Sequence, residues 1–119
     1  MNKIITCILI LGALLLTQPA SAHHSAAMFD FEKPAEIVGI VKEIKVANPH
    51  MKLVLEVTDE KGTRDITYEG HSRNNLYRRG WRPNSIKVGD KITITIATPR
   101  KGGDGGYVLG VKTAGGQEF

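Results

Sequence analysis

Cysteine is almost absent from this sequence, in which Cys7 is the only one among 119 residues. It lies within the apolar run 4–16, which is shorter than the roughly 20 residues that a membrane-spanning helix needs. If this run is removed during export, the rest of the chain has no disulfide, no thiol nucleophile and no thiolate metal site. A small exported domain without disulfides suits a bacterial periplasm better than a eukaryotic secretory route.

The first 22 residues have the pattern of a secretory signal peptide. Lys3 gives the positive amino-terminal part, the apolar run follows, and Ala20-Ser21-Ala22 matches an A-x-A cleavage site. Cleavage there would leave 97 residues, which suits one compact domain. We therefore expect residues 1–22 to be a signal peptide and the mature periplasmic chain to begin at His23. An uncleaved anchor is the alternative.

Aromatic residues and excess charge are also scarce. Aromatic residues make up 6% of the chain, and without Lys3 there are 15 basic residues against 12 acidic ones. This mild positive charge helps solubility or attracts anions weakly, and it is not typical of a nucleic-acid-binding protein. The outer faces of the expected strands carry threonine, lysine and glutamate rather than the aromatic residues that stack on bases. We expect no nucleic-acid partner.

Alternating apolar and polar residues predict an all-β domain over residues 35–113, and no long repeat is present. The expected strands are 35–47, 51–58, 64–69, 91–98 and 106–112. A short helix over 75–79 separates the third strand from the fourth, with Ser72 or Asn74 as its cap and Gly80 at its C′ position. This order is that of a small five-stranded OB-like barrel, and an open meander or small sandwich is the main rival.

Some segments depart from regular alternation. Residues 23–34 are expected to be an N-terminal segment that leads into the domain, and residues 114–119 a flexible tail in which Phe119 could still dock. In the first strand the apolar positions change parity after Lys42 and Glu43, which predicts a β-bulge. The residues expected to plug the interior beside the helix are Leu76, Trp81 and Ile86, and those expected on one face of the last strand are Tyr107, Leu109 and Val111.

All four histidines, namely His23, His24, His50 and His71, follow the expected cleavage site. Cleavage would give His23 a free α-amine, and the amine and imidazole of one residue can chelate a metal at neutral pH. One further imidazole would complete a T-shaped site of three nitrogens, which favours Cu(II) over the weaker candidates Ni(II) and Zn(II). We predict that His50 supplies this imidazole, with His24 as an additional ligand.

His50 follows Asn48 and Pro49 in the loop between the first two strands, and in OB-folds this loop borders the ligand face. Because a residue before proline is held extended, this loop would project His50 at a fixed angle. The alternative is that His50 only caps a turn and that the terminal histidines are tolerated polar residues. Neither cysteine clusters nor H-x-x-x-H spacing supports a metal site, and a role for His71 depends on tertiary geometry.

A second candidate site is basic. The side chains around the short helix that could bind a partner are Arg73, Arg78, Arg79 and Arg82, with Lys87 nearby. Guanidinium groups bind carboxylates and phosphates, so this cluster could hold an acidic protein, a lipid headgroup or an anionic glycan. The alternative is an ordinary solvated face, which most charge runs are.

No catalytic arrangement stands out, and we expect a protein that is not an enzyme. Ser25, Ser72 and Ser85 lack the setting of a nucleophile elbow, and no two carboxylates share an evident apolar pocket. The glycine-rich segment 101–106 precedes no helix, so it is expected to be a flexible hairpin loop rather than a phosphate-binding loop. Copper redox chemistry has no independent support.

Short motifs along the mature chain resemble those of an uncharacterised family of small exported bacterial proteins, a domain of unknown function. The motifs are His23-His24-Ser25, Phe29-Asp30, Asn48-Pro49-His50, Arg78-Arg79-Gly80-Trp81 and Val88-Gly89-Asp90. The resemblance implies a periplasmic β-barrel-like domain and no particular activity. The sequence departs from the family at Met51, where an aromatic residue is expected, and at His71, where a histidine is not. The second departure argues against a role for His71.

The leading hypothesis is therefore a periplasmic, non-enzymatic binding protein that holds Cu(II) or a small ligand at His23, His24 and His50. The runner-up is an envelope interaction protein that binds an anionic partner through its arginine-rich surface. The two differ in the residues that they require, since one depends on imidazoles and the other on guanidinium groups.

Overall fold

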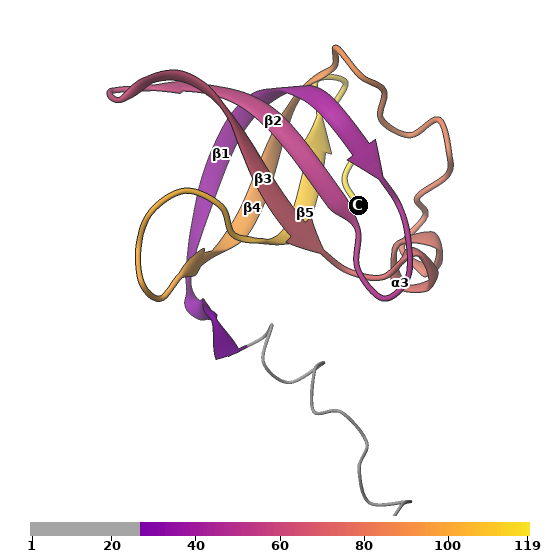
Figure 1. Cartoon of the computed structure of the whole chain (residues 1–119). Coiled ribbons are helices and arrows are strands. Elements are labelled where there is room, and N and C mark those ends of the chain that lie inside the picture. The colour runs from indigo at the N-terminus through magenta and orange to yellow at the C-terminus, as the bar shows by residue number, and fades with distance from the viewer. Residues whose placement is uncertain (1–26) are drawn as a thin grey trace, which may run out of the picture.

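The computed structural model describes residues 27–119, which form five strands and one short helix (Figure 1). The elements are β1 (Phe29–Lys45), β2 (Lys52–Asp59), β3 (Gly62–Gly70), α3 (Arg73–Arg78), β4 (Lys91–Pro99) and β5 (Tyr107–Thr113). The all-β class and the place of the helix between the third and fourth strands are confirmed. The expected signal peptide and both terminal histidines, His23 and His24, lie outside the described residues.

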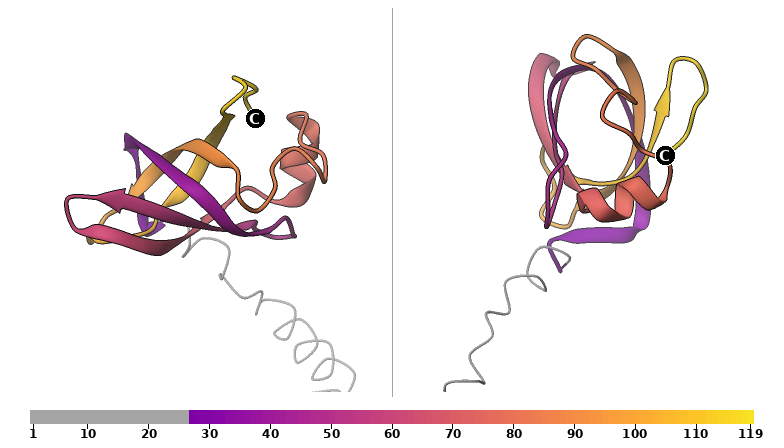
Figure 2. Two further views of the ribbon diagram at one scale, coloured as in Figure 1. Left: turned by 90° about the horizontal axis from the view of Figure 1, so that it is seen from above. Right: turned by 90° about the vertical axis from the view of Figure 1, so that its right-hand side faces the viewer.

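The strands close into a ring in the order β1-β2-β3-β5-β4. β1 pairs antiparallel with β2 on one side and with β4 on the other, so one strand joins the two halves of the sheet. The last seam is short and parallel, and it pairs Glu69 with Tyr107 and Gly70 with Val108. Figure 2 shows the strands around a common interior, with α3 beside one end of the ring. Within residues 27–119, no helix is long and apolar enough to span a membrane.

β1 is 17 residues long, and its register with β2 changes part-way along it. Its pairing with β2 shifts between Val41 and Glu43, which confirms the bulge expected from the change of parity. A Cβ atom at Gly39 would lie 2.8 Å from the carbonyl oxygen of Glu56, so this close approach requires glycine. The strand begins at Phe29 rather than at residue 35, and its pairing with β4 shifts again between Asp30 and Pro34.

The interior of the ring is filled by apolar side chains from all five strands. Val41, Leu53 and Ile94 are fully buried there. Leu76, Trp81 and Ile86, from α3 and the segment after it, are also buried, as the sequence predicts. Ser72 caps the helix by accepting a hydrogen bond from the Asn75 amide at 3.2 Å, and Gly80 follows its last turn with a φ of +99°.

β5 differs from the expected alternation. Thr95 pairs with Gly110 but Ile96 pairs with Val108, so Leu109 is an extra residue in the ladder. The bulge turns Val108 and Val111 into the core and leaves Tyr107 and Leu109 only partly buried. The expectation that Tyr107, Leu109 and Val111 share one face was wrong, because three alternating apolar residues cannot reveal a bulge between them.

The carboxyl-terminal residues return to the sheet instead of forming a flexible tail. The Phe119 amide donates to the Val111 carbonyl at 2.9 Å, and the Val111 amide donates back to Phe119 at 3.1 Å. The Phe119 ring lies 5.1 Å from that of Trp81, centroid to centroid, and is buried. Backbone pairing and an apolar contact thus both hold this segment against the rest of the domain. Of the two, only the apolar contact could be expected from the sequence.

Candidate functional site

The loop before β2 holds the His50 side chain in a defined orientation. The Asn48–Pro49 peptide bond is cis, and the Asn48 amide lies against Asn74 at the start of α3. Nδ1 of His50 is 3.1 Å from the carbonyl oxygen of Gly70, an acceptor only, so Nδ1 carries the proton and donates. The other ring nitrogen, Nε2, is then left with its lone pair. Many metal-binding histidines are oriented in the same way, by a hydrogen bond from the ring nitrogen that does not bind the metal.

His71 directly follows the last residue of β3, and His50 lies two positions before the start of β2. The regular pairing of β2 with β3 ends at Lys52 and Glu69. Backbone bonds hold the two segments together there: the Met51 amide donates to His71 at 3.0 Å and the Gly70 amide donates to Met51 at 3.1 Å. Met51 is thus bonded to both Gly70 and His71, which departs from a regular ladder but keeps the two segments side by side. The sequence could not reveal this proximity, because it depends on which strands are paired.

Tyr107 is the centre of an aromatic cluster on this outer face. Its ring meets those of His71 and His50 edge-on, at centroid distances of 5.4 and 6.2 Å. Its hydroxyl lies 3.3 Å from Nδ1 of His71. The rings of Phe29 and Phe31 pack on its other sides at 5.9 and 5.6 Å. The bulge in β5 leaves Tyr107 outside the core, and its ring therefore connects the start of β1 to the two histidines.

The surroundings favour the neutral forms of His71 and Tyr107. Burial lowers the pKa of His71, and the nearby charges of Arg79 and His50 lower it further. Burial also raises the pKa of Tyr107, as does the charge of Glu69. At neutral pH the cluster therefore holds an uncharged imidazole at His71, the form that coordinates metals.

The described chain begins beside this cluster. Phe29, which contacts Tyr107, is six positions after His23, and six residues span at most about 20 Å. Residues 27–119 contain no group of three or more His, Cys, Asp or Glu side chains that could hold a metal. A complete metal site would need ligands from outside the described residues.

A groove of about 740 Å³ opens next to the start of β1. Its walls include Met28, Phe29 and Glu69, with Arg100 and Lys101 from the loop after β4. Met28 is 63% exposed and Phe31 is 43% exposed, so this face carries apolar surface close to the histidines. The groove is next to the aromatic cluster, since Phe29 lines the groove and also contacts Tyr107.

The arginine cluster divides into two kinds of side chain. Arg79 donates to the Leu109 carbonyl at 3.1 Å, and Arg82 donates to the Tyr77 carbonyl at 3.0 Å and to that of Trp81. Arg79 thus fastens the end of α3 to β5, whereas Arg82 braces the segment after the helix. All four arginines are exposed, and none of the ion pairs within residues 27–119 involves Arg73 or Arg78. These two guanidinium groups are the more available to a partner.

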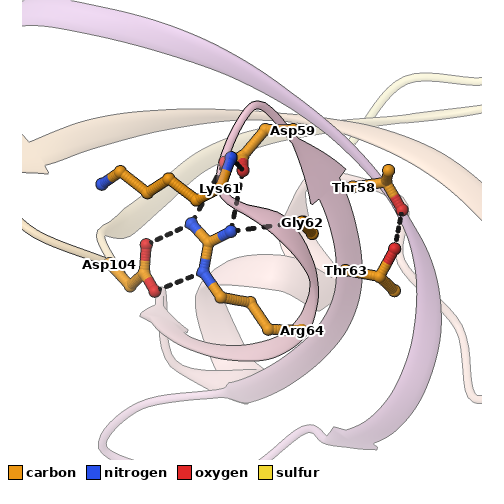
Figure 3. Close-up of polar contacts among 7 residues, drawn as sticks. All are labelled: Thr58, Asp59, Lys61, Gly62, Thr63, Arg64 and Asp104. Carbon is orange, nitrogen blue, oxygen red and sulfur yellow. Dashed lines mark hydrogen bonds and ion pairs between the residues drawn. The ribbon is translucent and has the colours of Figure 1, made fainter.

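Sequence reasoning missed a polar clamp at another part of the ring (Figure 3). Arg64 of β3 donates to Asp104 through two hydrogen bonds of 2.7 Å and to Asp59 at 2.8 and 3.1 Å. The guanidinium lowers the pKa of Asp59 to about 2 and also lowers that of Asp104. The glycine-rich loop is thus fixed to the β2–β3 hairpin rather than free, and the 40 positions between Arg64 and Asp104 hid this pairing.

The chain was compared with known proteins. The sequence model of DUF6152, a family of unknown function, matches residues 12–108. The chain belongs to this family. No curated protein and no solved structure matches the chain. Family membership confirms the resemblance to an uncharacterised family and assigns no activity.

Proposed function

We propose that the protein is an exported periplasmic binding protein, not an enzyme, that binds Cu(II) at the mature amino terminus. The ligands are the α-amine and imidazole of His23 and the imidazole of His50, with His24 as an additional ligand. The observation that supports this most is the His50 ring, whose Nδ1 is bonded to the Gly70 carbonyl. Its Nε2 is thereby presented on the face where the described chain begins.

The barrel proposed for this module is OB-like. The strand order along the chain, the shared long β1 and the helix between β3 and β4 support that assignment. In such barrels the loop between the first two strands borders the ligand face. His50 lies in that loop, so the barrel topology and the metal hypothesis favour the same surface.

The metal hypothesis is tested by titrating Cu(II) into the mature protein and into its His23→Ala, His50→Ala double variant, with a competing chelator to set the affinity. We expect the double variant to lose the tight site, because it lacks two of the three nitrogens and the chelate ring. The Arg73→Glu, Arg78→Glu variant is the matched control and should bind Cu(II) like the parent. Equal affinity of the double variant and the parent would end the proposal.

A second candidate function is binding of an anionic envelope component by the exposed pair Arg73 and Arg78. Their exposure without an ion pair among residues 27–119 supports it. Vesicles of anionic phospholipid should bind the parent at low salt, whereas the Arg73→Glu, Arg78→Glu variant should not. Reversing Lys112, which pairs with Glu118 at 3.4 Å, is the control. Identical binding by the parent and the arginine variant would rule this surface out.

A further inference from the structure

His71 has no part in the function proposed above, yet its ring contacts the same tyrosine, Tyr107, as the ring of His50. Backbone bonds from Met51 to His71 and from Gly70 to Met51 hold the two segments side by side. Backbone pairing therefore limits how far the two histidines can move apart. Two imidazoles fixed in this way need little ordering before they bind a common ligand.

The two rings are also oriented through the same nitrogen. Nδ1 of His50 is engaged with the Gly70 carbonyl, and Nδ1 of His71 is engaged with the Tyr107 hydroxyl. Each ring therefore has Nε2 as the atom left for an outside partner. Hydrogen bonds to one imidazole nitrogen that set the role of the other are a general feature of metal-binding histidines.

Tyr107 supports both rings at once. It contacts His50 and His71 edge-on, and Phe29 and Phe31 hold its own ring from the β1 side. The hydrogen bonds of the two rings go to the Gly70 carbonyl and the Tyr107 hydroxyl. Two imidazole nitrogens suit Cu(II), Ni(II) and Zn(II).

We propose that His50 and His71 form a two-imidazole clamp for a divalent transition metal, and that Tyr107 is the positioning residue of this clamp. The proposal deepens the proposed function, on which it rests for the identity of the metal. It adds His71 as a ligand that the sequence argued against.

The test measures Cu(II) binding to four forms of the mature protein: the parent, His71→Ala, His50→Ala and the parent with an acetylated amino terminus. Losing His71 should weaken binding by at least about tenfold, since even supporting residues of metal sites commonly cost 10–100-fold. The acetylated form should keep a weaker site, and adding His71→Ala to it should remove that site. The nitrogen hyperfine pattern in the electron paramagnetic resonance spectrum should lose one nitrogen in His71→Ala.

The outcomes separate this inference from the proposed function. If His50→Ala loses Cu(II) while His71→Ala binds like the parent, the clamp is wrong and the proposed function stands. If both single variants bind like the parent, the clamp is again wrong, and the role proposed for His50 fails with it. His71→Asn is the second variant in case the alanine form does not fold, and Thr67→Ala on the same strand is the matched control.

The role of Tyr107 is tested by Tyr107→Phe, which keeps the ring contacts and removes the hydroxyl. We expect weaker Cu(II) binding and a changed resonance spectrum, because the orientation of His71 loses its hydrogen bond. Tyr77→Phe, on the exposed side of α3, is the matched control and should change neither. A Tyr107→Phe variant with the parental spectrum and affinity would show that the hydroxyl positions nothing.

Discussion

At the scale of single residues, Tyr68 makes folding sensitive to alkaline pH. Its side chain is 2% exposed inside the ring, and burial, with a smaller contribution from Asp104, raises its pKa to about 12 from 10. A raised pKa means that the unfolded chain loses the proton first. The stability that this hydroxyl contributes is therefore complete below pH 10 and is lost as the pH rises toward 12.

Tyr68→Phe should flatten the fall in stability over that range. Urea unfolding followed at several pH values between 9 and about 12 measures the slope directly. Tyr77→Phe, an exposed tyrosine on α3, should leave the parental slope unchanged. If Tyr68→Phe keeps that slope as well, the alkaline loss has another origin.

Gly70, next to His71, has little room for a side chain. A Cβ atom there would lie 3.0 Å from Cγ of Met51 and 3.1 Å from Cβ of Val108. Gly70→Ala should therefore destabilise the protein by about 1–3 kcal/mol, as overpacked cores do. Gly110→Ala is the matched control, because its new methyl group would meet nothing closer than 3.7 Å. Equal midpoints of urea unfolding for the two variants would contradict this reading of the packing.

At the scale of elements, the Arg64 clamp joins the β2–β3 hairpin to the loop between β4 and β5. Arg64→Gln should speed amide hydrogen exchange in residues 100–106, because the loop loses its two bonds to β3. Lys42→Gln breaks an exposed cross-strand pair of 3.2 Å with Glu56 and should leave loop exchange unchanged. The stabilising effect of the clamp should also be lost as the pH falls from 3.8 toward 2, the range in which Asp59 becomes protonated. Unchanged loop exchange in Arg64→Gln would show that the loop is fixed by other contacts.

The elements also show what the sequence could and could not predict. β2 and β4 alternate cleanly, so Leu53 and Ile94 were placed correctly from local pattern alone. β5 failed at Leu109, since a bulge looks like ordinary alternation until the partner strand is known. His50 could be identified as a candidate from its neighbours in the sequence. The contact of His71 with Tyr107 could not, because these two residues are 36 positions apart. The role of short segments could thus be predicted from the sequence, whereas the register between strands could not.

At the scale of the whole molecule, the ring depends on its carboxyl-terminal residues. Phe119 packs on Trp81, the residue that plugs the interior after α3, and pairs by backbone with Val111 of β5. The buried side chain of Phe119 thus links the end of the helix, the interior and the last strand. Small domains have about 5–15 kcal/mol of stability in total, so a single such contact matters for the entire fold.

Phe119→Ala should cost about 3–5 kcal/mol, because it empties a buried aromatic site. Trp81 is the only tryptophan of the chain, so its fluorescence reports this contact directly. We expect a red shift of the emission in the native state and a lower urea midpoint. Glu118→Gln is the control, since it removes only an exposed ion pair with Lys112 and should change neither. An unshifted emission with a parental midpoint would mean that Phe119 does not cover Trp81, and the carboxyl-terminal segment would then be the flexible tail that the sequence suggests.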